Sequence, residues 1–172
     1  MADTPAQQFS EIYTQHIAIV WKTVHAFALT KEDRDDLCQE ILIALWEALP
    51  EFEGRAKLST YVYRVAHRRA LNWKRSQRRY DHRLARYENE LPALSLGQSD
   101  PTAQARLDWL YRAINTLKPV DRTLCLLYLD GLAHREIAEI LGLSEDNISI
   151  RVHRCKQQLA QILERSRPHE EL

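Results

Sequence analysis

The sequence predicts an all-α protein made of two small helical domains joined by a flexible linker. Apolar residues recur with a helical period over most of the chain, and no segment shows the period of two that is typical of a strand. Between residues 81 and 103 this pattern is lost, and two prolines and a glycine interrupt the chain. We therefore expect a domain at residues 1–80, a linker at 81–103, a second domain at 104–167 and a tail at 168–172.

Three helices are predicted in the first domain. The apolar period from Ala6 to Ala28 indicates one amphipathic helix. Thr30 begins a capping-box pattern for the second helix, and Pro50 ends it. Ser59 is the candidate N-cap of a third helix that extends to about residue 79.

Four shorter helices are predicted in the second domain. The apolar period returns at about residue 104, and Pro119 suits the first turn of the next helix, which Gly131 ends. Two more helices follow, the first ending at Gly142 and the second capped by Ser144. The layout from residue 132 onward is that of a helix-turn-helix, which binds DNA in many proteins and is a plain structural corner in others.

Charge is distributed unevenly along the chain, although its 24 Lys and Arg balance its 24 Asp and Glu. Residues 55–86 carry eleven bases and one acid, while residues 1–53 carry three bases and ten acids. A basic block beside an acidic one indicates two different partners, one of them polyanionic.

No enzymatic or metal site can be assembled from the sequence. The three cysteines, Cys38, Cys125 and Cys155, are far apart in sequence, and we interpret them as free, buried thiols. A redox switch built on them stays an alternative. We expect no cofactor, no metal and no catalysis, and the absence of a membrane span or a secretory signal predicts a cytoplasmic protein.

The basic block is predicted to form a two-faced helix. At about 100° per residue, one face is apolar and the other is rich in arginine. Arginine matches phosphate groups, and an exposed aromatic ring offers an unpaired base a stacking surface. An ordinary solvated face is the alternative. The apolar face consists of Val62, Ala66, Ala70 and Trp73, and the other face of Tyr61, Arg64, Arg68, Asn72, Arg75 and Arg79.

The last helix is predicted to present polar side chains opposite its apolar stripe. Most of them can hydrogen-bond to base edges or phosphates from the part of the helix that enters a major groove. Ile150 is the exception, and it suits a thymine methyl group. The set is Ser149, Ile150, His153, Arg154 and Gln157.

Two strings of the sequence resemble a known family. The string DRDDLCQEILIALWEALPEFEGRAKLSTYVYRVAHRRALNWKR is similar to the second conserved region of the extracytoplasmic-function (ECF) sigma factors of bacterial RNA polymerase. The string INTLKPVDRTLCLLYLDGLAHREIAEILGLSEDNISIRVHRCKQQL is similar to their fourth region. Together they cover about two-thirds of the chain in the family's order.

The resemblance implies a role for each candidate surface. Asp36, Gln39 and Glu40 would bind the clamp helices of the largest polymerase subunit. The basic helix and the loop before it would open the minus-ten element and hold the melted non-template strand, and the last helix would read the minus-thirty-five element as duplex. Many members are held by an anti-sigma factor, so such a partner is expected. The implied minus-ten residues are Phe52, Arg55, Lys57, Thr60, Tyr61, Arg64, Arg68, Asn72 and Arg75.

The sequence departs from the family pattern at several of these positions. Tyr61 replaces a usual tryptophan, and Arg68 stands where asparagine is common. Ser149 and Ile150 stand where a basic residue and a serine are frequent, and Asp146 where glycine is usual. These changes leave the promoter sequence open. The alternative functions are a dimeric regulator that binds duplex DNA without polymerase and an RNA-binding adaptor.

Overall fold

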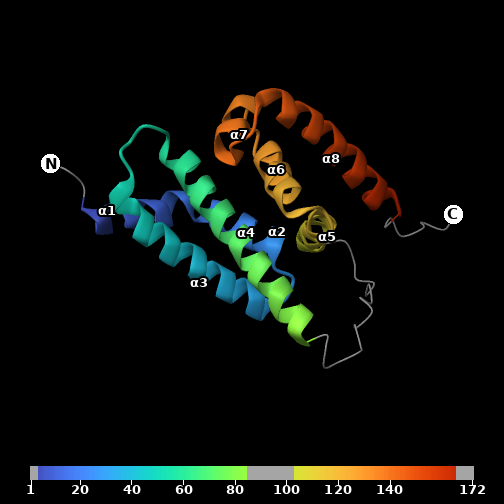
Figure 1. The fold of residues 1–172 in the computed structure, drawn as a ribbon, viewed down its shortest axis with the longest axis horizontal. Coiled ribbons are helices and arrows are strands. Elements are labelled where there is room, and N and C mark those ends of the chain that lie inside the picture. Colours follow the sequence, from blue (N-terminus) through green and yellow to red (C-terminus); the bar gives the residue numbers. More distant parts are fainter. Residues whose placement is uncertain (1–3, 85–102, 166–172) are drawn as a thin grey trace.

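A computed structural model describes residues 4–84 and 103–165, and every regular element within those ranges is a helix (Figure 1). No helix in this described part is long and apolar enough to cross a lipid bilayer. The elements are α1 (Pro5–Glu11), the π-helical turn η1 (Ile12–His16), α2 (Ile17–Phe27), α3 (Lys31–Ala48), the 3₁₀ turn η2 (Leu49–Glu51), α4 (Leu58–Leu84), α5 (Ala103–Asn115), α6 (Pro119–Leu129), α7 (His134–Leu141) and α8 (Glu145–Arg165).

The first two predicted helices are present, with one addition. The first is an unbroken helical run from α1 through α2, in which η1 inserts a π turn that the apolar period did not indicate. The second is α3, whose first turn is capped by Thr30, since its hydroxyl accepts a hydrogen bond from the backbone N–H of Asp33 at 3.1 Å. The α-helix ends at Ala48, two residues before Pro50.

The predicted start of the third helix was wrong by two residues, because an N-cap at Ser59 places the first helical residue at Thr60. α4 begins at Leu58, and the backbone N–H of Tyr61 already bonds to the carbonyl oxygen of Lys57 at 3.1 Å. Ser59 therefore lies within the first turn, where its backbone is already helical, and is not the N-cap. The helix continues to Leu84, beyond the predicted end. The rest of the predicted linker, residues 85–102, lies outside the described residues, as does the predicted tail.

The apolar face of α4 packs against α2 and α3. Val62, Ala66 and Ala70 are fully buried and Trp73 is 7% exposed. The small alanines let the helices approach closely, while Phe27 and leucines of α3 fill the space around them. This packing fixes the rotation of α4 about its own axis, and so decides which of its side chains face solvent.

The second half contains the predicted helix-turn-helix, formed by α7 and α8. Gly142 has the left-handed backbone conformation (φ 66°) that ends α7, and Gly131 (φ 78°) ends the preceding helix in the same way. Ser144 accepts a hydrogen bond from the N–H of Asn147 at 3.3 Å, as expected of a cap. The core of this half includes Ile137, Ile148, Val152 and Cys155, all nearly or fully buried.

The two halves pack directly on each other. α5 and α6 lie against α2, and α6 and α7 lie against α4, while α8 lies on the outer side (Figure 1). Buried residues of both halves form one continuous apolar cluster. The sequence did not predict this contact, and it places α7 beside the first turns of the basic helix.

Candidate nucleic-acid interface

The polar face of α4 is exposed from Arg64 to Arg75, and the side chain of Arg79 lies outside the described residues. Arg64, Arg68, Asn72 and Arg75 all reach solvent, so this row can meet a polyanion. Thr60 differs from the other predicted contacts because it is only 7% exposed. In this structure its side chain packs inside the domain rather than on the arginine-rich face.

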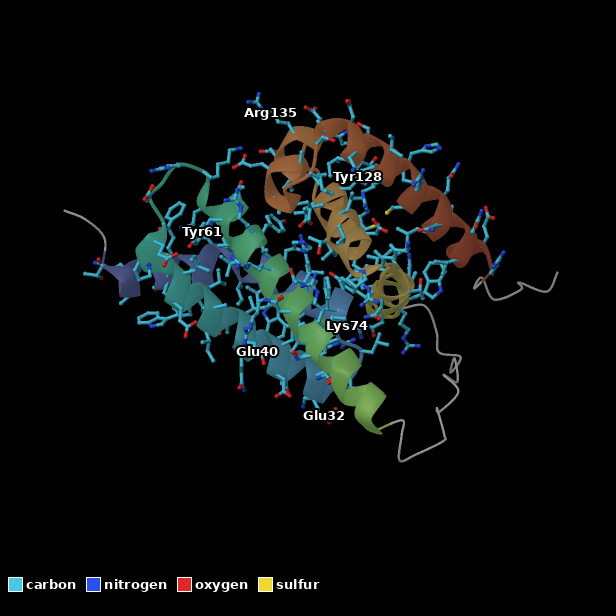
Figure 2. The ribbon with its side chains drawn as sticks, in the orientation of Figure 1. Glu32, Glu40, Tyr61, Lys74, Tyr128 and Arg135 are labelled. Atoms are coloured by element: carbon cyan, nitrogen blue, oxygen red, sulfur yellow. The ribbon has the colours of Figure 1, made fainter. Side chains whose placement is uncertain are left out.

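The aromatic ring predicted at the start of this face is already in contact with another ring. The centroids of Tyr61 and Phe52 lie 4.9 Å apart, and the Tyr61 hydroxyl donates a hydrogen bond to the carbonyl oxygen of Ala48 at 2.5 Å. Burial raises the pKa of the Tyr61 hydroxyl, and the charge of Glu51 adds to this. Tyr61 thus sits at the loop end of α4 (Figure 2) as part of a small aromatic cluster with both rings half-buried.

Acidic side chains of α7 meet the basic surface. Lys57 Nζ lies 3.1 Å from Glu136 Oε1, and a guanidinium nitrogen of Arg64 lies 3.3 Å from Glu139 Oε1. These pairs span 79 and 75 residues of sequence, so helical periodicity within one segment could not reveal them. The available signal was the pair of glutamates in HREIAEIL, three residues apart and hence on one helix face.

The predicted polymerase-binding residues lie on α3. Asp36 and Gln39 are exposed. Glu40 forms an ion pair with Arg69 of α4 at 2.9 Å, and so joins the acidic helix to the basic one (Figure 2). Its carboxylate is only partly available to a partner.

The residues predicted to read duplex DNA share the outer face of α8. Ile150, His153, Arg154 and Gln157 are exposed there, and Ser149 is exposed but hydrogen-bonded to His134 at 3.0 Å. On its other side α8 is held against α6. Arg151 bridges Asn147 of its own helix and Asp121 of α6, at 2.8 and 2.9 Å.

An open groove of about 980 Å³ lies between α8 and the start of α6. Lys118, Arg151 and Arg154 line it together with Asp121 and Ile150. The groove gives the polar face of α8 a partly basic flank, which suits an approaching phosphate backbone.

Two residues of α4 that the sequence analysis passed over lie at the contact between the halves. The Tyr63 hydroxyl donates to a carboxylate oxygen of Asp130, whose other oxygen pairs with Lys22. Burial, the hydrogen bond to Asp130 and the charge of that carboxylate all raise the pKa of Tyr63. His67 Nδ1 lies 2.6 Å from the Thr123 hydroxyl oxygen, and burial lowers the pKa of this histidine to about 4.

All three cysteines are buried, as expected of small apolar residues. Within the described ranges, no group of three or more His, Cys, Asp or Glu side chains has the arrangement to hold a metal ion.

Comparison with known families identifies the two halves. The model of Sigma-70 region 2 matches residues 12–80, and that of Sigma-70, region 4, matches residues 107–159. The chain is also 23% identical over 157 residues to the ECF RNA polymerase sigma factor SigM of Mycobacterium tuberculosis, covering 90% of this chain and 76% of that protein. The chain belongs to the ECF sigma factors. Proteins of this family are subunits for transcription initiation and not enzymes.

Other relatives match this sigma factor over nearly its whole length. It is 22% identical to the RNA polymerase sigma factor YlaC of Bacillus subtilis, with 99% of this chain and 98% of the relative covered. Two solved structures share its fold: CnrH in complex with the cytosolic domain of CnrY (TM-score 0.63, 21% identity, 95% and 96% covered), and RpoE of Bartonella quintana in complex with the anti-sigma factor NepR (TM-score 0.62, 21% identity, 91% and 99% covered).

Proposed function

We propose that this ECF sigma factor binds core RNA polymerase, directs it to promoters by reading two elements in different physical forms, and opens the minus-ten element. The polymerase performs the chemistry. The observation that carries the proposal is the presence, on one chain with both sigma regions in order, of an exposed arginine row on α4 and a separate exposed polar row on α8.

Docking on polymerase is assigned to the acidic helix α3. Asp36 and Gln39 are exposed side by side and available to the clamp helices of the largest subunit, with Glu40 as a secondary contact because Arg69 already pairs with it. An acidic docking surface repels DNA, and the basic surface beside it attracts DNA, so the DNA is kept off the surface assigned to polymerase.

Opening of the minus-ten element is assigned to the loop before α4 and to the arginine row. Extruding a base costs a few kcal/mol of lost stacking. Contacts to the non-template strand must offset this cost, and a base stacked on an aromatic ring contributes about 1–3 kcal/mol. The Tyr61 and Phe52 rings stand at the end of the row Arg64, Arg68 and Arg75, where a displaced base and its phosphates would both find a partner.

Reading of the minus-thirty-five element is assigned to α8. His153, Arg154 and Gln157 are exposed donors or acceptors for base edges and phosphates, and Ile150 is exposed to meet a methyl group. Arg151 bonds to Asn147 and Asp121, and so holds α8 against α6 without using the outer face of α8.

An anti-sigma factor is proposed as a further partner. The two solved relatives of the same fold were each determined with another protein bound, which is an anti-sigma factor in the case of RpoE. We place the complex in the cytoplasm, because the polymerase and the promoters are there.

The proposal is tested by association with core polymerase and by transcription. The wild type should co-elute with core enzyme and start transcripts from specific sites in a genomic DNA library. Asp36→Lys should weaken association at least fivefold, whereas Glu164→Lys, which makes the same charge change on an exposed residue at the end of α8, should not. If the chain alone shifts promoter duplex as well as it does with polymerase, it is a stand-alone regulator. Binding to unrelated single-stranded RNA, with no association with core polymerase, would indicate an RNA-binding adaptor.

A further inference from the structure

Helix α7 covers part of the surface assigned to the melted strand. Its two carboxylates, Glu136 and Glu139, pair with Lys57 and Arg64, the cations that flank Tyr61 in the sequence. Arg135 of the same helix points outward, away from α4 (Figure 2). The acidic side of α7 is thus turned toward the basic helix.

The carboxylates occupy positions that phosphates would take. Lysine and arginine bind carboxylate and phosphate oxygens with the same donors and at similar distances. Glu136 is held in place as well, because its second oxygen accepts a hydrogen bond from the backbone N–H of Ala133 at 3.1 Å. The side chains of the two pairs are between 37% and 76% exposed, so neither pair is sealed from solvent and a competing polyanion can displace them.

The contact does not depend on these two ion pairs alone. Asp130, the residue directly after α6, joins Lys22 and Tyr63, and the side-chain amide of Asn115 donates to the carbonyl oxygen of Ala26 at 3.0 Å. These contacts anchor α5 and α6 on the first half, and α7 follows them. The position of α7 over the start of α4 is therefore part of the packed structure.

The duplex-reading surface is left uncovered in the same arrangement. His153, Arg154 and Gln157 face solvent on α8, on the outer side of the molecule (Figure 1). The same packing of the two halves thus has opposite effects on the surfaces for single-stranded and for duplex DNA. It occupies cations that would hold a single strand and leaves the face for the duplex free.

We propose that α7 is a built-in competitor for the single strand, and that Glu136 and Glu139 act in place of the phosphates of the melted strand until the two halves separate. The inference rests on the proposed function, because it takes the α4 surface as the site of the melted strand. In the packed form the chain keeps its duplex-reading face available while its affinity for single-stranded DNA is reduced.

The test is Glu136→Gln/Glu139→Gln in the full chain without polymerase. Glutamine keeps an oxygen that can accept the Ala133 N–H, so the change removes charge and spares the helix start. Binding to a fluorescent single-stranded DNA oligonucleotide of mixed sequence should become about two- to tenfold tighter at low salt, the range expected for losing two partly exposed pairs. Binding to a duplex should change less than twofold. The matched control is Glu32→Gln/Glu164→Gln, which makes the same charge change on exposed residues, Glu32 lying at the far end of the molecule from α7 (Figure 2).

A double-mutant cycle separates competition from a general charge effect. In the background Lys57→Gln/Arg64→Gln, removing the two carboxylates should no longer improve single-strand binding. The inference is overturned by equal single-strand affinity of wild type and Glu136→Gln/Glu139→Gln, by no detectable binding of either, or by an equal gain in the control or in the double-mutant background. Association with core polymerase, measured on the same preparations, decides the proposed function separately.

Discussion

The imidazole of His67 on α4 is joined to the hydroxyl of Thr123 on α6, with Nδ1 and Oγ1 2.6 Å apart. Both side chains are buried, at 8% and 3% exposure, so this hydrogen bond lies inside the contact between the two sigma regions. Burial disfavours the charged imidazole and lowers the pKa of His67 to about 4 from its ordinary 6.5, so the ring is neutral at pH 7.

Acid should therefore separate the two halves. If His67 regains its ordinary pKa when the halves part, the packed form is favoured fully above pH 6.5, and that advantage is lost as the pH falls from 6.5 toward 4. The open fraction should rise by up to about tenfold per pH unit in this window. Small-angle scattering between pH 7 and 5 should show a growing radius of gyration. His67→Gln, which can still bond to Thr123 but does not titrate, should flatten the response, and an unchanged response would rule out His67 as its source.

Asp130→Asn should loosen the same contact by a different route. The change removes the charge that pairs with Lys22 and weakens the acceptor for the Tyr63 hydroxyl. We expect a loss of about 1–2 kcal/mol in the free energy of unfolding and a Tm lower by about 2–8 °C. Thermal denaturation followed by circular dichroism measures it. Asp35→Asn, on an exposed residue of α3, should leave Tm within about 1 °C, and equal Tm values for both variants would contradict the role of Asp130.

Tyr61→Ala should impair promoter opening, since it removes a ring that packs on Phe52 at the start of the arginine row. With polymerase present, permanganate reactivity of minus-ten thymines should fall at least fivefold. Tyr61→Phe keeps the ring and loses only the hydrogen bond to the Ala48 carbonyl, so it should stay within twofold of wild type. Equal melting by Tyr61→Ala and wild type would remove the residue from this role.

Arg154→Ala should weaken recognition of the upstream duplex and leave melting intact once the complex has formed. The residue is exposed on the outer face of α8, far in sequence from the strand-binding helix. If the guanidinium reads a base, we expect binding to weaken by about 1–3 kcal/mol. If it holds a phosphate, the slope of the logarithm of the binding constant against the logarithm of the salt concentration should become shallower by about one. Footprinting of holoenzyme on duplex promoters at several salt concentrations distinguishes these cases. Lys156→Ala, on a neighbouring exposed residue that packs over the Tyr128 ring, is the control.

Local patterns predicted the helices and their inner faces well. The helical spacing alone predicts the burial of Val62, Ala66 and Trp73. Thr30 caps the start of α3 and Gly142 ends α7, and both follow from the residue type and its immediate neighbours. The family resemblance is confirmed by the matches to both sigma regions. The Ser59 cap was wrong because neighbouring backbone groups, and not the residue type, decide where the first helical turn closes.

The contact between the halves could not be predicted in this way. It uses a third face of α4, with Tyr63 and His67, that looks like the edge of the apolar stripe in sequence. Its partners lie 67 and 56 residues away, beyond any helical period. Residues 55–86 contain a single acid, and the carboxylates that pair with Lys57 and Arg64, those of Glu136 and Glu139, come from another helix.

The burial of all three thiols has a practical consequence for measuring these motions. Cys38, Cys125 and Cys155 are each at most 9% exposed in the native fold. A cysteine introduced at an exposed position, such as Gln39 on α3 or Gln158 on α8, would be the most accessible sulfur nucleophile in the molecule. Spectroscopic labels can thus be attached at chosen surface sites while the native sulfurs stay in place.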